Sequence, residues 1–384
     1  MIVGIDASNL NEGGGLTHLL EILANFDIDQ HNIDRVIIWG RTKTLIQVGN
    51  YSWLKKISPR ELNFSLFRRL VWQRYGLTKS AKVNDCDLIF SPGSIFFSNF
   101  KPYVTMSQNM LPFVSKEAKR YGFSLKGVRL MLLRQIHSRA FISSEGIIFL
   151  TNYAKDRVTK VLGKRAYLSS TVISHGVSAR FFTSPKEQFN NSEYSLGRPF
   201  NIVYVSTLDL YKHQWHVVEA VAKLRKEGYP VILNLFGSFY LPSKKRLEKS
   251  IKKLDFNNEW VKYHGAVPYL ELHKIYKQAD LGVFASSCEN MPIILLEKMA
   301  SGLPIACSNM GPMLEILGNN SELFNPEDPL EIYHTIKKLI NNKQLRADEA
   351  QANFESAQKY TWKKCSFETF SFLEQVFINY RESK

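Results

Sequence analysis

The sequence has little cysteine, no long apolar run and fewer acidic than basic residues. Its four cysteines lack the spacing of a Cys-x-x-Cys motif or metal site, which favours free thiols in a reducing compartment. No run of eighteen apolar residues occurs, so no transmembrane helix is predicted. The first ten residues carry no basic segment or cleavage site, so no secretory signal is predicted. These absences favour a cytoplasmic protein.

What the sequence does contain is enough apolar material for two folded domains. Of its 384 residues, 45% are hydrophobic and 22% are charged, a composition that excludes wholesale disorder. A chain of this length exceeds one ordinary hydrophobic core and suits two domains of typical size.

The positive charge is unevenly distributed along the chain. The net charge is +15, of which residues 1–178 carry +12 and residues 179–384 carry +3. A basic half attracts polyanions, and charge alone does not choose among nucleic acid, an anionic lipid surface and a phosphorylated small molecule.

Short apolar runs alternate with helix-sized segments in both halves of the chain. Runs of this kind are typical of buried parallel strands, and the polar stretch Thr183–Pro199 between the two series predicts a linker. The sequence therefore predicts an α/β fold with two Rossmann-like domains facing a cleft, in which ligands bind beyond the carboxyl ends of the strands. The predicted divisions are an N-terminal Rossmann-like domain (1–180), a linker (181–199), a C-terminal Rossmann-like domain (200–361) and a helix that packs back across both domains (362–384).

The most informative motif lies within residues 286–306. Glu289 and Glu297 are separated by seven residues, and Pro292 suits the first turn of a helix that carries Glu297 on its second turn. The dipole and first amides of that helix, at Ile293 and Ile294, suit a phosphate group. Two carboxylates so placed suit hydroxyl groups on either side of a diphosphate. The same pattern would arise if Glu289 were an ordinary charge in a loop and Glu297 lay on a solvated face of the helix.

Further residues extend this motif into a resemblance to a known family. Glu-x7-Glu followed by Lys-Met-Ala-Ser-Gly-Leu-Pro resembles the nucleotide-sugar signature of the retaining glycosyltransferases of family 4 (glycosyl transferases group 1), which have the two-domain GT-B fold. The glycine triplet at 13–15 and the segments 173–177 (ISHGV), 205–213 (VSTLDLYKH), 265–267 and 279–280 agree with the family in order and spacing. The resemblance covers nearly the whole chain, and it is strong over 200–330 and weaker before residue 100.

The resemblance implies a role for each matching residue. Lys212 matches the lysine that neutralises the donor diphosphate, Glu297 the carboxylate on the ribose hydroxyls, and Glu289 the carboxylate that faces the donor sugar. The backbone near Val267 would meet the base, and the N-terminal glycines would let a loop approach the phosphates or the acceptor. The predicted catalytic residues are Glu289, Lys212 and Gln108, and the predicted donor-binding residues are Gly14, Gly15, Thr207, Lys212, Val267, Glu289, Met291, Ile293, Ile294 and Glu297.

Three positions depart from the family pattern. Ser206–Thr207 stands where the family has a glycine–arginine pair, which leaves one strong cation for the diphosphate. Asn290–Pro292 replaces Gly-Phe-Gly and removes one amide donor. Gln108 and Asn109, the predicted acceptor-binding residues, stand where the first domain of the family has a His-Asp pair. The amide of Gln108 can hydrogen-bond a sugar hydroxyl, but it cannot exchange a proton.

Two Asp-x-Asp triplets, Asp27–Asp29 and Asp85–Asp87, resemble the metal-binding pair of another class of glycosyltransferase. Their places at a helix end and before a strand favour turns. The sequence therefore predicts no metal, and no cofactor besides the nucleotide-sugar donor.

Two basic segments of the first half, 41–79 with net charge +8 and 116–139 with net charge +6, interleave basic and aromatic residues. Such a pattern suits a nucleic-acid surface, or an anionic membrane that bears a lipid-linked acceptor. Leu125, Val128 and Leu132 begin an apolar helical stripe beside arginines, which an ordinary amphipathic core helix would also show.

Together these features predict a retaining, metal-independent hexosyltransferase in the cytoplasm, peripheral on the inner face of the plasma membrane. It would move a sugar from a GDP- or UDP-linked donor to a saccharide or polyprenyl-diphosphate-linked acceptor, as in the assembly of bacterial surface polysaccharides such as O-antigen. Two alternatives stay open. A nucleotide-sugar 2-epimerase of the same fold would need acidic and histidine groups where Gln108 and Asn109 stand, and a basic nucleic-acid-binding protein would need a binding module that the sequence does not display.

Overall fold

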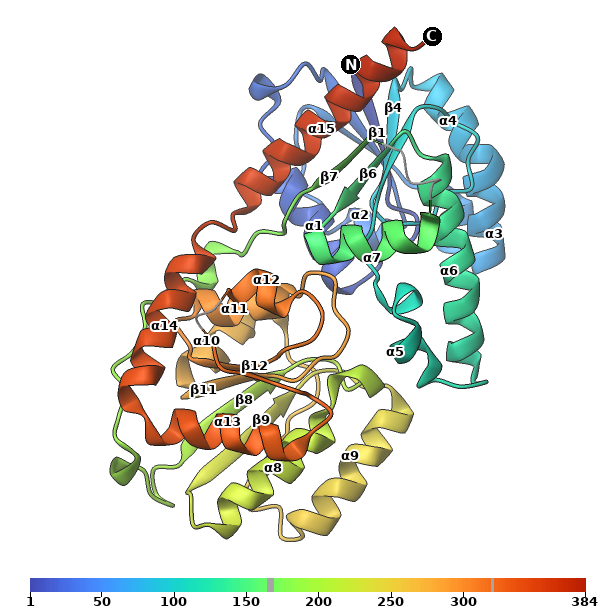
Figure 1. Cartoon of the computed structure of the whole chain (residues 1–384). Helices are drawn as coiled ribbons and strands as arrows, with labels where there is room; N and C mark the ends of the chain where they lie inside the picture. Colours follow the sequence, from blue (N-terminus) through green and yellow to red (C-terminus); the bar gives the residue numbers. More distant parts are fainter. Residues whose placement is uncertain (164–168, 319–320) are drawn as a thin grey trace. The chain divides into compact units, whose positions relative to one another are not determined.

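The computed structural model describes residues 1–163, 169–318 and 321–384, and it forms two compact units (Figure 1). The first unit contains Met1–Gly176 and Thr361–Lys384, and the second contains Val177–Tyr360. The chain therefore leaves the first unit once and returns to it near its C-terminus.

The first unit is built on a parallel sheet of seven strands in the order β3-β2-β1-β4-β5-β6-β7. Most residues of the central strands are buried, as expected for a parallel sheet covered on both faces. The strand order reverses between β1 and β4, which are direct neighbours. The strands are β1 (Ile2–Asp6), β2 (Arg35–Trp39), β3 (Leu54–Ile57), β4 (Leu88–Ser91), β5 (Tyr103–Met106), β6 (Gly146–Phe149) and β7 (Ser169–Val172).

Helices from both ends of the chain cover this sheet. α15 (Trp362–Glu382) packs beside α1 (Gly13–Ala24) and contacts β4 and β6. Leu77 and Ala81 of α4 (Leu77–Val83) pack with Trp39 in an apolar cluster. The other helices of this unit are α2 (Thr42–Leu45), α3 (Leu66–Val71), α5 (Ser115–Lys119), α6 (Leu125–Ser143) and α7 (Asn152–Leu162).

The second unit repeats the architecture with six parallel strands in the order β10-β9-β8-β11-β12-β13. Here the order reverses between β8 and β11. α8 (Gln214–Lys226) packs against α9 (Leu241–Leu254) and α13 (Pro329–Asn341), and α11 (Ile293–Ala300) packs against α14 (Lys343–Ala357). The strands are β8 (Phe200–Val205), β9 (Val231–Phe236), β10 (Val261–Tyr263), β11 (Leu281–Phe284), β12 (Ile305–Ser308) and β13 (Leu323–Phe324), and the remaining helices are α10 (Leu272–Gln278) and α12 (Met313–Leu317).

The predicted fold class, two parallel α/β sheets, is confirmed. The prediction missed β3, an edge strand whose Lys55 and Lys56 interrupt the apolar run that marks the other strands. It was also wrong about the glycine triplet, because Gly13–Gly15 forms the first turn of α1 rather than a loop. Gly13 opens this turn with a left-handed φ of 71°, and the buried side chains of Leu16 and Leu19 anchor the helix after the glycines.

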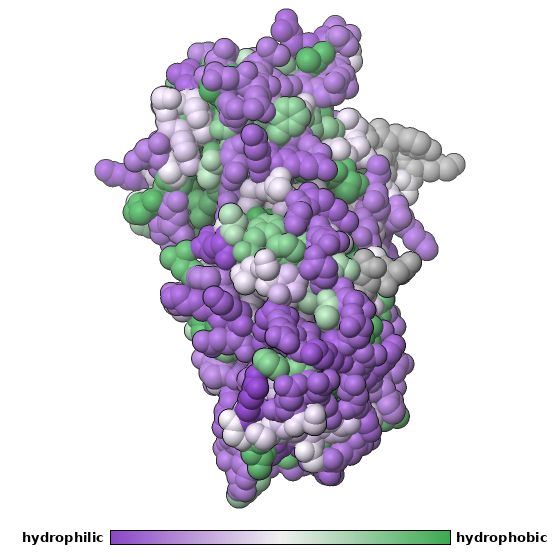
Figure 2. Space-filling model, turned by 90° about the vertical axis from the view of Figure 1, so that its left-hand side faces the viewer, coloured by the Kyte–Doolittle hydropathy of each residue, from purple (hydrophilic) through white to green (hydrophobic). Residues whose placement is uncertain are grey.

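The surface is mainly hydrophilic on the face of the molecule that Figure 2 draws, where hydrophobic side chains occur in small groups. Among the residues that the structure describes, no helix combines the length and the apolarity needed to cross a membrane.

Candidate functional site

The reversal of strand order in the second unit brings two loops together. β8 ends at Val205 and the neighbouring β11 ends at Phe284, so the segments 206–213 and 285–292 leave the same edge of the sheet. Ligands of doubly wound sheets bind at such a reversal, beyond the carboxyl ends of the strands. The two loops carry Lys212 and Glu289, which are far apart in the sequence.

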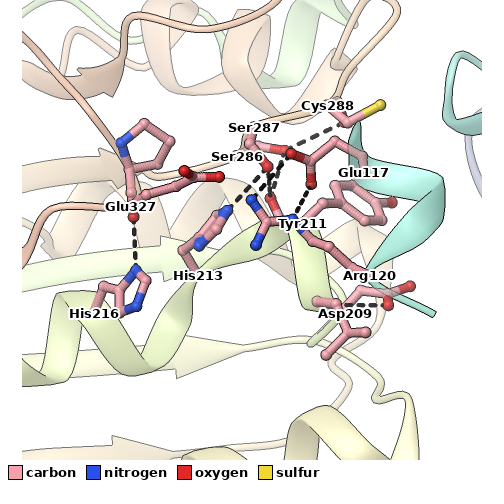
Figure 3. A network of polar contacts seen from close by, with 12 residues as sticks. Glu117, Arg120, Asp209, Tyr211, His213, His216, Ser286, Ser287, Cys288 and Glu327 are labelled. Atoms are coloured by element: carbon pink, nitrogen blue, oxygen red, sulfur yellow. Dashed lines mark hydrogen bonds and ion pairs between the residues drawn. The ribbon is translucent and has the colours of Figure 1, made fainter. Parts of the chain in front are cut away.

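Hydrogen bonds hold the two loops in one arrangement (Figure 3). The Ser287 N–H donates to the Tyr211 carbonyl at 2.8 Å, and the Ser287 hydroxyl lies 2.9 Å from Nε2 of His213. The Tyr204 hydroxyl donates to the Lys212 carbonyl at 2.7 Å. His213 begins α8 in the left-handed region, with φ of 51°, and it is fully buried. The backbone around Lys212 is therefore braced from both sides.

Lys212 and Glu289 form a largely buried ion pair between Nζ and Oε1. Their side chains are 8% and 13% exposed, and the Lys212 ammonium also lies 5.3 Å from the centroid of the Phe284 ring. A buried charge that loses its partner is strongly destabilised, so the ammonium requires an anion at this place. In this structure the anion is the Glu289 carboxylate. The phosphate group of a ligand also carries negatively charged oxygens that pair with an ammonium.

The helix that follows Glu289 presents its N-terminus at the same edge. α11 begins after Pro292, which makes no side-chain capping bond, so the amides of Ile293 and Ile294 keep no intrahelical acceptor. The side chains of Met291 and Ile293 are buried and anchor this turn. Backbone N–H groups and the helix dipole favour an anion here.

Glu297, on the second turn of α11, is fully buried and is therefore not a solvated helix face. Its Oε2 lies 3.5 Å from the Tyr276 hydroxyl. Burial raises the pKa of Glu297 to about 7, and the Tyr269 hydroxyl and the Lys298 amine act in the opposite direction. The carboxyl group is thus held inside the unit with its protonated form favoured by burial.

The remaining predicted donor residues of the second unit are less enclosed. Thr207 follows β8, and its hydroxyl lies 3.2 Å from the Ser238 hydroxyl. Val267 is half-buried in the segment after β10. Both positions lie beyond carboxyl ends of strands in the sheet that carries Lys212.

The first unit brings Gly15 and Gln108 together. A Cβ atom at Gly15 would lie 2.6 Å from Oε1 of Gln108, so the glycine permits a close approach of this side chain to α1. Gln108 follows β5, and its amide nitrogen contacts the Met106 sulfur at 3.3 Å. Asn109 accepts a hydrogen bond from the Leu111 N–H at 3.1 Å and holds the turn, whereas Gly14 is exposed on α1.

Both Asp-x-Asp triplets lie in turns. Asp27 caps a short 3-10 helix by accepting from the Asp29 N–H, and Asp85 adopts a left-handed φ of 54°. Asp87 accepts a hydrogen bond from the Ile2 N–H at 2.7 Å. Within 1–163, 169–318 and 321–384, no group of three or more His, Cys, Asp and Glu residues could hold a metal ion.

Sequence reasoning missed three residues of this region: His213, Ser287 and Lys298. Only the structure reveals the bond between His213 and Ser287, because the two residues are on different loops. Lys298 did leave a signal, since it interrupts the apolar helix sequence Ile-Ile-Leu-Leu-Glu-Lys-Met-Ala.

Comparison with known proteins identifies the second unit. Residues 186–356 match the family described as glycosyl transferases group 1. O-antigen chain mannosyltransferase B of Escherichia coli is 25% identical over 251 residues, which are 65% of this chain and 61% of that relative's length. The matched region thus spans less than two thirds of the relative.

Solved structures match over almost the whole chain. Sucrose-phosphate synthase from Thermosynechococcus elongatus has a TM-score of 0.78 at 14% identity, covering 99% of this chain and all of that one. Anabaena HepE, solved in complex with UDP and glucose, has a TM-score of 0.71 at 18% identity, covering 98% of this chain and all of that one. The fold is thus the one found in these solved structures, and residues 186–356 place the second unit in the glycosyl transferases group 1 family, the family that the sequence resembles.

Proposed function

We propose that this protein is a glycosyltransferase that moves a sugar from a nucleoside-diphosphate donor to a saccharide acceptor with retention of configuration. The observation that carries the proposal is the Lys212–Glu289 pair at the strand reversal of the second unit, beside the N-terminus of α11. The same unit matches the glycosyl transferases group 1 family.

In this proposal the diphosphate takes the place of Glu289 as the partner of Lys212. The ammonium and the α11 amides then offset the charge that develops on the departing diphosphate, which is the usual task of preorganised donors at a transition state. Glu289, released from its ion pair, accepts hydrogen bonds from hydroxyl groups of the donor sugar. Glu297 serves the ribose hydroxyls.

Gln108 and Asn109 bind the acceptor in this mechanism. An amide holds a sugar hydroxyl but takes no proton from it, so the acceptor proton passes to the leaving phosphate as the acceptor attacks from the same face. No side-chain nucleophile is required. The predicted donors are GDP- and UDP-linked hexoses. The UDP and glucose bound by HepE and the mannosyl transfer in the name of the E. coli relative support these two classes.

A donor screen tests the proposal. Purified protein is incubated with a panel of UDP-, GDP-, ADP- and dTDP-sugars, and release of nucleoside diphosphate is measured with and without a panel of saccharide acceptors. We expect turnover with a UDP- or GDP-hexose and an axial or equatorial product bond that matches that of the donor by NMR. Inverted product, or epimerised donor without transfer, would contradict the proposal.

Metal independence belongs to the same proposal, because Lys212 and the α11 dipole supply the positive charge at the diphosphate. We expect the transfer rate in excess EDTA to equal the rate in added magnesium. Loss of activity in EDTA that magnesium or manganese restores would refute this part of the mechanism.

The surface of the first unit favours a membrane-bound acceptor. Three apolar side chains at the start and middle of α6 are exposed, namely Leu125 (93%), Met131 (72%) and Leu132 (59%). They lie among Lys126, Arg129 and Arg134 of the same helix, and α5 and α6 border an apolar groove of about 450 Å³. Exposed apolar side chains among basic ones suit insertion at an anionic lipid surface, where each nearby Lys or Arg contributes about 1 kcal/mol.

We propose that α6 attaches the enzyme to anionic membranes that carry a lipid-linked saccharide. The test is co-sedimentation with vesicles of phosphatidylcholine containing 0, 20 or 40% phosphatidylglycerol, beside gel-shift assays with DNA and RNA. We expect binding that increases with anionic lipid and decreases with salt. Tight retention of nucleic acid by protein that ignores the vesicles would favour a nucleic-acid partner instead.

A further inference from the structure

Lys298 is a buried charge-bearing residue that the mechanism above does not use. Its side chain is fully buried, and its Nζ has no hydrogen-bond partner among the residues that the structure describes. A lysine in such surroundings loses its hydration, and an unpaired ammonium is costly to bury. The position therefore needs either a neutral amine or a nearby negative charge.

The fold makes room for this side chain. A Cβ atom on Gly282 of β11 would lie 3.0 Å from Cδ of Lys298, so the glycine leaves space for the aliphatic chain against the strand. The Lys298 Nζ lies 5.1 Å from the ring centroid of Phe284 and 5.6 Å from that of Tyr276. Aromatic faces attract an ammonium and also tolerate a neutral amine. The surroundings of Lys298 therefore accept both protonation states of its amine.

The amine of Lys298 lies beside the candidate donor site. Nζ of Lys298 and Nζ of Lys212 both lie within 5.3 Å of the centroid of one ring, that of Phe284. Phe284 is the last residue of β11, directly before the loop of Glu289. A charge that arrives at Lys212 therefore changes the electrostatic surroundings of Lys298.

The groups that face Lys298 come from several elements. Burial lowers the pKa of Lys298 to about 7, and the positive charge of Lys212 acts in the same direction. Glu297 on the same helix, the Cys307 thiol on β12 and Glu289 act in the opposite direction, and the Tyr276 ring contributes its face. In the ligand-free protein Glu289 is already paired with Lys212, so little negative charge is left for a second ammonium.

We propose that Lys298 is a proton-linked second cation of the donor site, neutral in the ligand-free protein and protonated by one proton from solution when a nucleoside diphosphate binds. The lone pair of Nζ accepts the proton, and the resulting ammonium lies behind Lys212 and offsets the charge of the diphosphate without touching it. This inference rests on the proposed function. It supplies a replacement for the arginine that the Ser206–Thr207 segment lacks.

The proposal accounts for an otherwise unfavourable choice of residue. A permanently charged arginine at position 298 would have no partner before the donor binds, whereas a lysine can lose its proton while the site holds no ligand. Lys298 is therefore a positioning residue that tunes the electrostatic field of the site. Its signature is proton uptake on ligand binding, which a purely structural lysine would not show.

The experiment is isothermal titration of the full chain with UDP and with GDP at pH 8, in phosphate and in Tris buffer. The two buffers differ in ionisation enthalpy. The difference between the two observed binding enthalpies, divided by the difference between the two ionisation enthalpies, gives the number of protons taken up. At this pH the terminal phosphate of either nucleotide is already ionised and contributes few protons. We expect the wild-type protein to take up more than half a proton, the Lys298→Met variant to take up almost none, and Lys277→Ala, which changes an exposed lysine of α10, to keep the wild-type uptake.

The outcomes separate this inference from the proposed function. Binding without proton uptake, or equal uptake in wild type and Lys298→Met, overturns the role of Lys298 and leaves the donor site intact. Loss of uptake in Lys277→Ala as well as in Lys298→Met shows that the loss is not specific to Lys298 and overturns the inference too. Absence of nucleotide binding by folded wild-type protein overturns both.

A second measurement keeps the test decisive if Lys298→Met fails to fold. Uptake of a proton makes the nucleotide affinity of the wild type decrease as pH rises from 7.5 to 9, by up to about tenfold per pH unit. An affinity that is flat over this range contradicts the proposal.

Discussion

The second unit buries charged side chains where its strands end, whereas the first unit exposes apolar and basic side chains on a helix. Lys212, Glu297 and Lys298 are each at most 6% exposed in the second unit, while Leu125 and Met131 of the first are more than 70% exposed. Buried charges are expensive and are kept where a ligand uses them. Exposed apolar groups mark a surface that another molecule covers. This contrast supports the proposal that the second unit binds the donor and the first unit binds the acceptor.

The largest expected effect comes from removing the ammonium at the donor site. Lys212→Ala should reduce kcat/KM by roughly 30- to 1000-fold, since a buried cation opposite a diphosphate contributes on the order of 2–4 kcal/mol at the transition state. Steady-state kinetics with the donor found by the screen provide the measurement. Lys277→Ala, which changes an exposed lysine of α10, is the matched control and should retain wild-type rates. Equal rates in the wild type, Lys212→Ala and Lys277→Ala would contradict the assignment of donor binding to the second unit.

The buried charges also predict how stability depends on pH. The pKa of Glu297 is raised to about 7, so its contribution to stability is present below pH 4.5 and is lost as pH rises to 7. The pKa of Lys298 is lowered to about 7, so its contribution is lost as pH falls from 10.5 to 7. Each slope approaches about 1.4 kcal/mol per pH unit, so the difference in unfolding free energy between the wild type and a variant that lacks the group should change with pH over these ranges.

Urea unfolding of wild type, Glu297→Gln and Lys298→Met at pH 5, 7 and 9 measures these differences. The unfolding free energy of Glu297→Gln relative to the wild type should rise between pH 5 and pH 7, and that of Lys298→Met relative to the wild type should fall between pH 7 and pH 9. If both variants follow the wild-type curve at every pH, neither group is held with the shifted pKa that its burial implies.

The contrast in exposed apolar groups is tested on vesicles. Leu125→Asp combined with Met131→Asp should weaken binding to anionic vesicles at least tenfold, because a fully inserted apolar side chain contributes about 1.5–3 kcal/mol. Phe256→Asp changes a side chain that is 76% exposed in the second unit, and it should leave vesicle binding unchanged. Equal losses from both changes would show that attachment is not a property of α6.

The smallest expected effect concerns the amide in the first unit. Gln108→Ala should reduce kcat/KM for the acceptor by about 2- to 10-fold, the equivalent of one neutral hydrogen bond, with donor affinity unchanged. Gly15→Ala should act in the same direction, because its new Cβ would meet Oε1 of Gln108 at 2.6 Å and displace the amide. A change in donor affinity in Gln108→Ala would mean that Gln108 also contacts the donor, whereas such a change in Gly15→Ala alone would agree with the predicted approach of this glycine to the donor.

Local composition was enough to predict most elements of the second unit. The apolar run Leu281–Phe284 is a strand that is buried at every residue, because a parallel strand covered on both faces reads as a continuous apolar segment. The pairing of Glu289 and Glu297 around a helix start was also predicted, since Pro292 and the apolar run after it mark that start locally. The family resemblance rests on the same contiguous residues.

Tertiary structure decided what these residues touch. The ion pair of Lys212 with Glu289 and the bond of His213 with Ser287 join loops more than seventy residues apart, and only the strand order brings them together. Burial of Lys298 depends on the space that Gly282 leaves on a neighbouring strand. The sequence by itself determined the strands, the helices and the chemical types at their ends, because these depend on neighbours along the chain. Pairing, burial and pKa depend on neighbours in space, and the fold alone supplies them.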